Sequence, residues 1–417
     1  MAEVLPLQAL HYDLGKVGAL GDVVAPPYDV IDDAQRAELV LRSEHNVVEL
    51  DLPRDPDGGD PYEHAARLLG RWTEEGTLTR DPEPALWALE QAYTAPDGSE
   101  LTRRGFLARV KLAPYGEGIR PHERTQPGPK EDRLRLTRAT GHNMSPIFAL
   151  HPGNAWRHLE SAAEDDPWGE MTDGDGTTHR VWRIADPAAH EAVAAELEPG
   201  ELLIADGHHR YETALAYQRE AGEGGGADYV LMALVSLEDP GLTVFATHRL
   251  LKELGPEQQE AIRDAAGDHF DLEEVAEDEL VPGLDEPPVS FGYMDSHHRK
   301  AWRLRLNDAG AGALDEALAG RSDAYRRLDS AALEELFLKR AVGLSPDDIA
   351  AKKGLAYTPS KDEAIAALTN GYDAAFFLRP TPVDQVRAVA AAGETMPPKS
   401  TYFFPKLLTG IVFNPLA

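Results

Sequence analysis

The sequence contains no cysteine at all. This absence excludes disulfide bonds, thiolate catalysis and cysteine-rich zinc sites, and it agrees with a cytoplasmic protein. No stretch approaches the roughly 18 uninterrupted apolar residues of a membrane-spanning helix. Residues 1–16 also lack the basic and apolar regions of an export signal, so we expect neither secretion nor membrane association.

Basic residues are scarce, with 41 Lys and Arg against 72 Asp and Glu, and the net charge of the 417 residues is -31. Proteins that coat nucleic acids gain affinity by neutralising phosphates with Lys and Arg, so we expect no nucleic-acid partner. A small anionic ligand in a locally basic pocket is still compatible with this charge. The hydrophobic content of 42% is enough for the cores of two or three domains and excludes global disorder.

The apolar patterning predicts a mixed α/β fold. Residues 86–94 and 103–112 flank a Pro-Asp-Gly turn and predict a β-hairpin. We expect the apolar strand at 228–237 to pair beside the strand that ends at 202–205. The other expected strands are 143–150, 178–184, 288–293, 301–306 and 373–378, and the other expected helices are 65–75, 211–220, 256–266, 328–342 and 384–392. The pattern of the sequence changes after Gly255. We therefore predict a first region at 1–255 and a C-terminal α/β region at 256–417.

The strongest candidate site is the segment Asp206-Gly207-His208-His209-Arg210, which lies between an apolar strand and a predicted helix. Unpaired N–H groups at a helix start, together with the helix dipole, favour phosphate. Gly207 lets the backbone approach a ligand, while the two imidazoles and the guanidinium donate to phosphate oxygens. Asp206 can hold Mg²⁺ or orient an imidazole, and the alternative is that it only caps the helix.

A second candidate is the segment at 120–125, in which Arg120 and Arg124 flank His122 and Glu123. It falls within residues 102–140, where ten basic residues accompany four acidic ones. A glutamate among cationic groups stays ionised, so Glu123 can act as a general base or help to bind a metal. The alternatives are a surface ion-pair network and a solvated basic face.

Two further segments carry polar groups that could contact a ligand. Thr247-His248-Arg249 follows an apolar strand, and strand ends often carry ligand groups in α/β folds. Lys399-Ser400-Thr401 offers an ammonium and two hydroxyls, although the aromatic residues after it fit core packing equally well. The segment at 297–300 repeats the His-His-Arg composition, but we expect a hairpin tip there because it lies between two predicted strands.

Six segments together resemble the domain-of-unknown-function 1015 family: APPYDVI, PHERT followed by KEDR, MSPIFAL, IADGHHRYETAL, THRLL and PPKSTYFFPKLLTG. The family is placed with the ParB and sulfiredoxin-like superfamily. This resemblance implies a nucleotide-binding α/β core, in which a strand–turn–helix holds the phosphates, with an added C-terminal region. Sulfiredoxin chemistry itself is excluded because it requires a cysteine.

The motifs are most similar in pattern to those of the ParB-like free serine kinases, which carry P-H-E, P-I and D-G-H-H-R segments. The matching positions here are Pro121 to Glu123, Pro146-Ile147 and Asp206 to Arg210. The resemblance implies that Glu123 deprotonates the acceptor hydroxyl and that the DGHHR segment binds nucleotide phosphates with Mg²⁺. The 83-residue interval from Glu123 to Asp206 is longer than in a compact ParB-like domain, which leaves the substrate open.

The leading hypothesis is a Mg²⁺-dependent kinase that uses ATP or ADP to phosphorylate the hydroxyl of a small metabolite such as free serine. A non-catalytic nucleotide-binding switch is the first alternative. The second is a metallohydrolase in which His122, His208, His209 and His248 share one ion. The kinase hypothesis assigns Glu123, His122, Asp206 and His209 to catalysis; Asp206 and Glu123 to the metal; Gly207, His208, His209, Arg210, Arg120, Arg124, Thr247, His248 and Arg249 to the nucleotide; and Lys399, Ser400 and Thr401 to the substrate.

Overall fold

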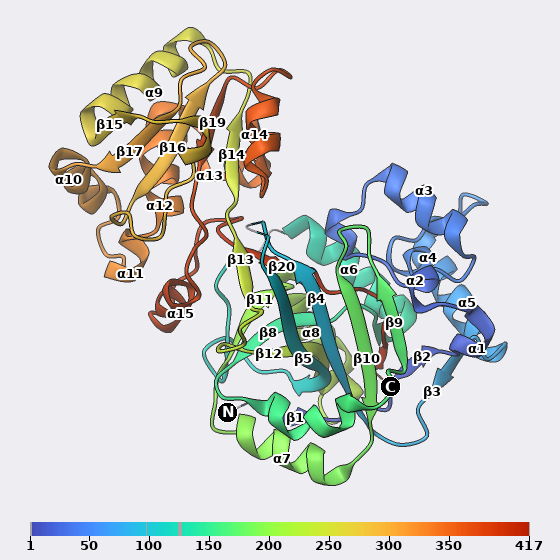
Figure 1. The fold of residues 1–417 in the computed structure, drawn as a ribbon. Coiled ribbons are helices and arrows are strands. Elements are labelled where there is room, and N and C mark those ends of the chain that lie inside the picture. Colours follow the sequence, from blue (N-terminus) through green and yellow to red (C-terminus); the bar gives the residue numbers. More distant parts are fainter. Residues whose placement is uncertain (1, 97, 124–126, 417) are drawn as a thin grey trace. The chain divides into compact units, whose positions relative to one another are not determined.

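The fold was obtained as a computed structural model, which describes residues 2–96, 98–123 and 127–416 (Figure 1). The chain forms two compact units, and each combines segments that are distant in the sequence. Unit 1 comprises residues 1–121, 125–243 and 405–417, and unit 2 comprises residues 122–124 and 244–404. None of the described helices is both long and apolar enough to cross a lipid bilayer.

Unit 1 is built on a mixed sheet of nine strands within the described residues. Its order is β6-β11-β8-β12-β5-β4-β10-β9, and β1 pairs with β5. The strands are β1 (Val4–Leu5), β4 (Leu86–Thr94), β5 (Glu100–Lys111), β6 (Ile119–Arg120), β8 (Ile147–His151), β9 (Gly169–Thr172), β10 (Thr178–Ile184), β11 (Leu202–Asp206) and β12 (Tyr229–Ser236).

The predicted hairpin around the Pro-Asp-Gly turn is confirmed, because β4 and β5 pair antiparallel from Trp87–Leu107 to Thr94–Glu100. Gly98 supports the turn with a φ of 82°, a conformation that glycine adopts without strain. The predicted neighbourhood of β11 and β12 is wrong. β8 lies between them, antiparallel to β11 and parallel to β12. The position of β8 within the sheet depends on long-range pairing, which local sequence patterns do not specify.

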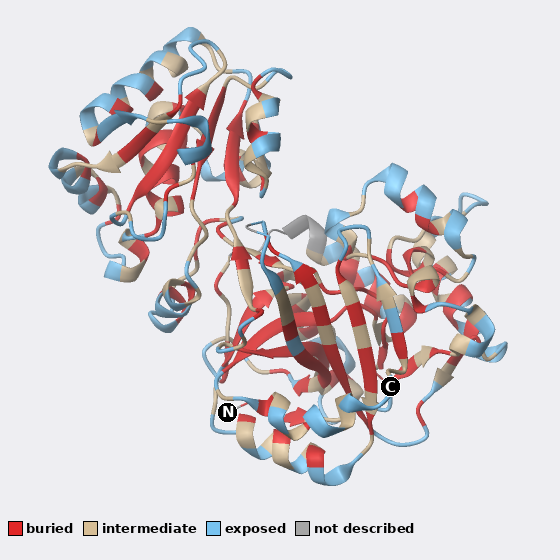
Figure 2. Ribbon diagram, viewed as in Figure 1, coloured by how far each residue is buried: buried red, intermediate tan, exposed pale blue. Residues whose placement is uncertain are grey.

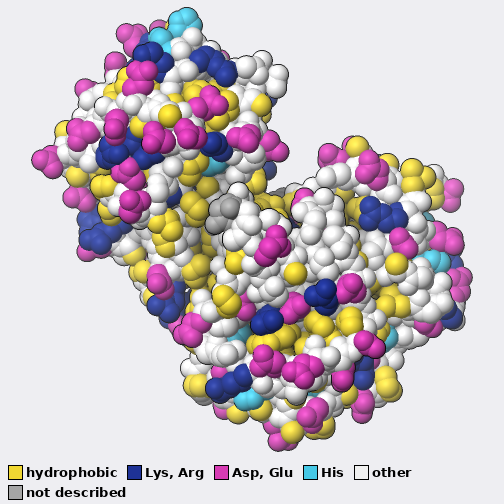
Figure 3. All heavy atoms as spheres, viewed as in Figure 1, with side chains coloured by type: hydrophobic (Ala, Val, Ile, Leu, Met, Phe, Trp, Pro, Cys, Tyr) yellow, Lys and Arg dark blue, Asp and Glu magenta, His cyan; other side chains and the backbone are white. Residues whose placement is uncertain are grey.

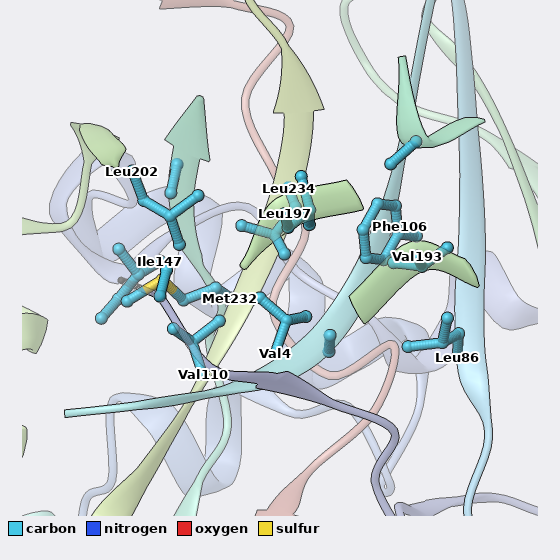
Figure 4. Packing of buried hydrophobic residues seen from close by; sticks show 14 of the residues in the cluster. Val4, Leu86, Phe106, Val110, Ile147, Val193, Leu197, Leu202, Met232 and Leu234 are labelled. Atoms are coloured by element: carbon cyan, nitrogen blue, oxygen red, sulfur yellow. The ribbon is translucent and has the colours of Figure 1, made fainter. Parts of the chain in front are cut away.

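One face of this sheet packs against α7 and α8 in an apolar core. Figure 4 shows Val193 and Leu197 of α7 beside Phe106, Met232 and Leu234 of the strands. A second cluster includes Trp72 and Phe413 and joins the N-terminal helices to the end of the chain. The helices are α1 (Leu14–Val17), α2 (Leu20–Val23), α3 (Asp33–Arg42), α4 (Val48–Asp51), α5 (Pro61–Glu74), α6 (Pro127–Thr140), α7 (Pro187–Leu197) and α8 (His208–Ala221).

Short elements complete unit 1. Among them, β21 near the C-terminus pairs antiparallel with β7, so the last strand of the sequence belongs to the first unit. The short strands are β2 (Leu10–Tyr12), β3 (Leu78–Arg80), β7 (His142–Asn143) and β21 (Asn414–Pro415), and the 3-10 helices are η1 (Tyr28–Val30), η2 (Ala155–His158), η3 (Glu160–Glu164) and η4 (Gly226–Asp228).

Unit 2 contains an antiparallel sheet in the order β15-β17-β16-β19-β14-β18. The expected hairpin around 297–300 is confirmed, because these residues connect β16 to β17. Figure 2 shows that the central strands of both sheets are buried while many helical residues are exposed. The strands are β14 (His248–Leu251), β15 (Phe270–Glu274), β16 (Ser290–Asp295), β17 (Trp302–Leu306), β18 (Leu355–Thr358) and β19 (Ala374–Phe377).

The amphipathic helix predicted at 328–342 is divided into an α-helix and a π-helix. Its Phe337 packs against Phe376 of β19, with ring centroids 4.8 Å apart. A separate two-stranded pair joins β13 (Thr243–Phe245) to β20 (Tyr402–Phe404). The helices are α9 (Pro256–His269), η5 (Glu277–Glu279), α10 (Asp308–Ala317), α11 (Asp323–Arg326), α12 (Asp329–Leu333), the π-helix η6 (Glu334–Ala341), α13 (Pro346–Ala350), α14 (Lys361–Ala367) and α15 (Val383–Ala391). The mixed α and β class predicted from the sequence is confirmed.

Candidate functional site

The Asp206-Gly207-His208-His209-Arg210 segment forms the turn between β11 and α8. The helix begins at His208, three residues before the predicted start, so both histidines belong to its first turn. The N-cap is Gly207, with a φ of 97°, and it has no side chain to accept the first-turn N–H groups. A Cβ at this position would also meet the guanidinium of Arg210 at 3.0 to 3.1 Å, so the conformation favours glycine and a larger residue would require the Arg210 side chain to shift.

Arg210 ties this turn to the start of β8. Its Nη1 donates to the Ser145 hydroxyl at 2.8 Å and to the carbonyl oxygen of Pro146. The guanidinium also lies 3.9 Å from Asp206. Because β8 runs antiparallel to β11, the beginning of β8 lies at the carboxyl end of β11. The MSPI and DGHHR segments of the sequence therefore meet at one edge of the sheet.

Asp206 is bound by a lysine that the sequence analysis did not assign. The Lys406 ammonium donates to Oδ2 of Asp206 at 3.0 Å, although 200 residues separate the two in the chain. Asp206 directly precedes the N-cap Gly207, and its carboxylate forms an ion pair beside the helix start. The only sequence signal for Lys406 was its place in the PPKSTYFFPKLLTG segment.

A polar pocket in unit 1 is lined by Arg210 together with Tyr28, Asp51 and Arg133. Arg133 and Asp51 form a buried ion pair at 2.9 Å, and the Arg133 guanidinium lies 4.3 Å from the centre of the Tyr28 ring. Burial raises the pKa of Asp51, and it raises the pKa of Tyr28 to about 12. The APPYDVI segment, which contains Tyr28, thus contributes to the same neighbourhood as Arg210.

The basic window at 102–140 consists largely of ion pairs in unit 1. Arg120, an expected nucleotide contact, lies in β6 and donates to both carboxylate oxygens of Glu201 at 2.7 and 2.9 Å. On the face shown in Figure 3, basic side chains are interspersed with acidic ones. This arrangement favours the ion-pair network over a continuous basic surface. The pairs are Arg104–Glu90, Lys111–Glu3, Arg120–Glu201, Lys130–Glu212, Arg133–Asp51, Arg135–Asp60 and Arg138–Glu220.

His122 and Glu123 belong to unit 2, where the segment at 396–401 holds them. The backbone N–H of Met396 donates to the carbonyl of His122 at 2.7 Å, and Glu123 forms a parallel bridge with Met396. The His122 ring, which is fully buried, places Nε2 2.8 Å from the Thr401 hydroxyl oxygen. Thr401 was expected to bind substrate, and the structure places it against His122. Arg124 lies outside the described residues.

The Thr247-His248-Arg249 segment is buried in unit 2. The backbone N–H of Leu378 donates to Nδ1 of His248 at 3.3 Å, and burial lowers the pKa of His248 to about 4. Arg249 donates to the carbonyls of Thr247 and Lys399, and burial lowers the pKa of its guanidinium. The Thr247 hydroxyl oxygen has no hydrogen-bond partner in the described part of the chain.

Lys399 and Ser400 take part in the folding of the segment that holds His122. Lys399 adopts a φ of 58°, which is uncommon for a residue with a side chain. The Ser400 hydroxyl donates to the carbonyl of Pro397 at 2.7 Å and lies 2.8 Å from the Ser330 hydroxyl. The Ser400 hydroxyl therefore stabilises the local backbone, and the Lys399 carbonyl accepts from Arg249.

No group of three or more His, Asp or Glu side chains among the described residues is arranged to hold a metal ion. The metallohydrolase alternative, which needs several histidines around one ion, gains no support from this part of the structure. Asp206 still fits Mg²⁺ as a single carboxylate, because Mg²⁺ is commonly bound through one or two carboxylates and the phosphates of a substrate.

A family described as Protein of unknown function (DUF1015) has a model that matches residues 4–331. No curated protein matches the sequence.

Solved structures with partial similarity include a conserved hypothetical protein from Pyrococcus furiosus, at 16% identity, 72% coverage of this chain, 92% of that chain and a TM-score of 0.37. A free serine kinase in complex with AMP has 15% identity, with 73% of this chain and 92% of that chain covered and a TM-score of 0.38. SbnI with a C-terminal truncation, from Staphylococcus aureus, has 12% identity, with 73% of this chain and 87% of that chain covered and a TM-score of 0.35. TM-scores this low do not establish a shared fold, so the family match is the informative finding.

Proposed function

The chain belongs to the DUF1015 family, and from that premise we propose that it is a nucleotide-dependent kinase that phosphorylates the hydroxyl of a small metabolite. The observation that carries this proposal is the turn at Gly207. It presents the start of a 14-residue helix with no N-cap side chain, beside two histidines and Arg210. Such a helix start binds phosphate through backbone N–H groups and the helix dipole.

In this proposal the first turn of α8 holds the phosphates of ATP or ADP. His208, His209 and Arg210 add charge-assisted or neutral hydrogen bonds to the phosphate oxygens. Arg210 is already fixed by Ser145 and Pro146, which lowers the entropy that it loses on binding. Asp206 is the proposed ligand of Mg²⁺, which when bound supplies positive charge to the transferring phosphoryl group.

Glu123 is the proposed general base. It accepts the proton of the acceptor hydroxyl as the hydroxyl oxygen forms a bond to the terminal phosphorus, while the bond from that phosphorus to the bridging oxygen breaks. The products are the phosphorylated metabolite and ADP, or AMP when ADP is the donor. His122 and the parallel bridge to Met396 support the proposal, because they fix the backbone on which Glu123 stands.

The test is a turnover assay by mass spectrometry with ATP or ADP, Mg²⁺ and a pool of hydroxyl metabolites that includes serine. We expect a phosphorylated product, and a loss of about 10²- to 10⁴-fold in turnover for Glu123→Gln. Glu117→Gln is the matched control, since it removes the same charge from an exposed position nearby in the sequence. Equal turnover by Glu123→Gln and the wild type would contradict the assignment of the base.

A nucleotide-binding switch is the second candidate function. It is favoured by one observation, namely that Asp206 to Arg210, Ser145 and Lys406 all belong to unit 1, whereas Glu123 belongs to unit 2. A switch needs only the first set. Binding of ADP to the wild type and to Glu123→Gln with equal affinity, without product from any acceptor in the pool, would favour the switch over the kinase.

A further inference from the structure

The residues that carry Lys406 are anchored to the sheet of unit 1 by their backbone. Nη2 of Arg103 donates to the carbonyl of Pro405, and Nε2 of Gln91 donates to the carbonyl of Lys406 at 3.1 Å. Gln91 and Arg103 are paired residues on β4 and β5. Two consecutive carbonyl groups are therefore held by two side chains that stand opposite each other on adjacent strands.

The anchor continues into β10 through a chain of hydrogen bonds. Gln91 accepts from Arg103 Nε at 3.1 Å through Oε1, and its Nε2 lies 3.3 Å from Nδ1 of His179. Nε2 of His179 lies 2.8 Å from Asp173. His179 is the register partner of Gln91, so the chain crosses three neighbouring strands in line.

This network is buried, since Gln91 and Arg103 are each 1% exposed and His179 is 0% exposed. Buried polar groups are costly unless they are hydrogen-bonded, so a connected network of this kind favours one arrangement of its members. The backbone at Pro405 and Lys406 therefore has a defined position, and the Lys406 side chain extends from it to Asp206.

A second cation of the network also interacts with Asp206. The Arg103 guanidinium lies 4.6 Å from the centre of the Phe148 ring; burial lowers its pKa to about 10, and the charge of Asp206 acts in the opposite direction. Nη1 of Arg103 is buried and has no hydrogen-bond partner among the described residues. Arg103 therefore adds positive charge near the carboxyl end of β11, where Lys406 and Arg210 already lie.

We propose that Lys406 is a further phosphate-binding residue of the site at the start of α8, and that Gln91 and Arg103 are positioning residues that hold its backbone in place. This inference rests on the proposed function, because it takes a nucleotide phosphate as the ligand. It differs from a purely structural role, in which Lys406 would contact Asp206 and no phosphate oxygen.

The first experiment measures the dissociation constants of ADP and adenosine by calorimetry for the full-length protein and its Lys406→Met variant. We expect ADP to bind about 10- to 100-fold more weakly to the variant, as for the loss of a hydrogen bond to a charged group, with adenosine affected less than twofold. Lys406→Arg is expected to retain most of the affinity for ADP, because a guanidinium also donates charge-assisted hydrogen bonds to phosphate oxygens.

The matched control is Lys111→Met. Lys111 also belongs to unit 1, is paired with a carboxylate at 3.0 Å and lies at the far end of β5 from Arg103. We expect Lys111→Met to bind ADP with the same affinity as the wild type. The proposal is overturned if Lys406→Met and Lys111→Met bind ADP equally well. It is also overturned if Lys406→Met lowers the affinities for ADP and for adenosine by the same factor.

A double-mutant cycle tests the positioning role. We expect Gln91→Met to lower the affinity for ADP several-fold in the wild-type background and to have no further effect on it in Lys406→Met. The reason is that the effects of substitutions at contacting residues that act together are not additive. Independent, additive losses would overturn the role of Gln91, and melting temperatures identify variants that fail to fold.

The outcomes separate this inference from the function on which it rests. Wild-type protein that binds ADP, with Lys406→Met unaffected, overturns the role of Lys406 and leaves the nucleotide-binding proposal intact. Wild-type protein that binds neither ADP nor ATP overturns both.

Discussion

Two His-His-Arg sequences occur in this chain, one at 208–210 and the other at 297–299, and they occupy different structural settings. The first opens α8 behind Gly207, which has no side chain to cap the helix. The second forms the exposed tip of the β16–β17 hairpin, where the Asp295 carboxylate accepts the backbone N–H groups of His297 and His298 at 3.0 and 2.6 Å. Identical side chains thus stand beside a helix start in one place and beside satisfied N–H groups in the other.

The difference shows that residue type alone does not define an anion site. A phosphate needs backbone donors that point in one direction, together with fixed cationic groups. Arg210 is fixed by Ser145 and Pro146, whereas Arg299 is exposed at a turn. The predictions below test whether this difference in setting determines nucleotide binding.

The largest expected effect comes from removing Arg210, and the matched substitution at Arg299 is its control. We expect Arg210→Ala to weaken ADP binding by about 100-fold, since it removes a charged donor and the tie to β8. Arg299→Ala is expected to change the dissociation constant less than twofold. Calorimetry with ADP checks both, and comparable losses for the two variants would contradict the comparison.

His248 adds a third setting, because this histidine is buried in a β-strand. Its pKa of about 4 in the folded protein is below the usual value of about 6.5, so between these pH values the unfolded chain binds more protons. The free energy of unfolding of the wild type therefore falls as the pH is lowered from about 6.5 to 4, by up to about 3 kcal/mol from this residue, and is unaffected by it above pH 7.

His248→Asn is the variant that tests this pH dependence, because the amide oxygen can accept from Leu378 without titrating. We expect urea unfolding at pH 7 and pH 4.5 to show a smaller loss of stability for the variant than for the wild type. The same loss in both proteins would show that His248 does not carry this part of the acid sensitivity.

An intermediate effect is expected for Gly207→Ala. The left-handed backbone costs an alanine about 1 to 2 kcal/mol, and the new Cβ would displace the Arg210 guanidinium. Both the free energy of unfolding and the affinity for ADP should therefore fall, as measured by urea unfolding and calorimetry. A variant with unchanged stability and affinity would show that the turn does not require glycine.

The smallest effect is expected at the hairpin tip. Arg299 has a φ of 54°, so Arg299→Gly relieves backbone strain but increases the entropy of the unfolded chain. We expect stabilisation by less than about 1 kcal/mol and no change in ADP binding. Destabilisation in urea unfolding would indicate that the Arg299 side chain makes a contribution to the turn that exceeds the strain.

Local patterns in the sequence predicted much of the fold. The Pro-Asp-Gly turn identified the β4–β5 hairpin, and the apolar strand before Asp206 followed by a helix identified the turn at Gly207. The sequence did not predict that β8 lies between β11 and β12, because the order of strands depends on long-range backbone pairing. It also missed the π-helix at Glu334–Ala341, which continues an ordinary amphipathic pattern.

For the candidate site, the sequence indicated residue types, and the structure showed their partners. The structure brings Asp206, Arg210 and Ser145 together, a contact that the sequence analysis did not predict, while Thr247, His248 and Arg249 are buried within unit 2. The placement of His122 against Thr401 joins two segments that the sequence analysis treated separately. That the α8 start binds a nucleotide and that Glu123 deprotonates the acceptor hydroxyl are both still predictions.

The sequence by itself determined the chemistry that this protein lacks and the local form of its main motif. Without cysteine it cannot use thiolates, and Asp-Gly between an apolar strand and a helix specifies a tight turn through the backbone preferences of a few neighbouring residues. The tertiary structure alone decided that Lys406 reaches Asp206 and that Gln91 and Arg103 hold the backbone beside it. Those contacts depend on long-range packing between segments hundreds of residues apart, which no local propensity encodes.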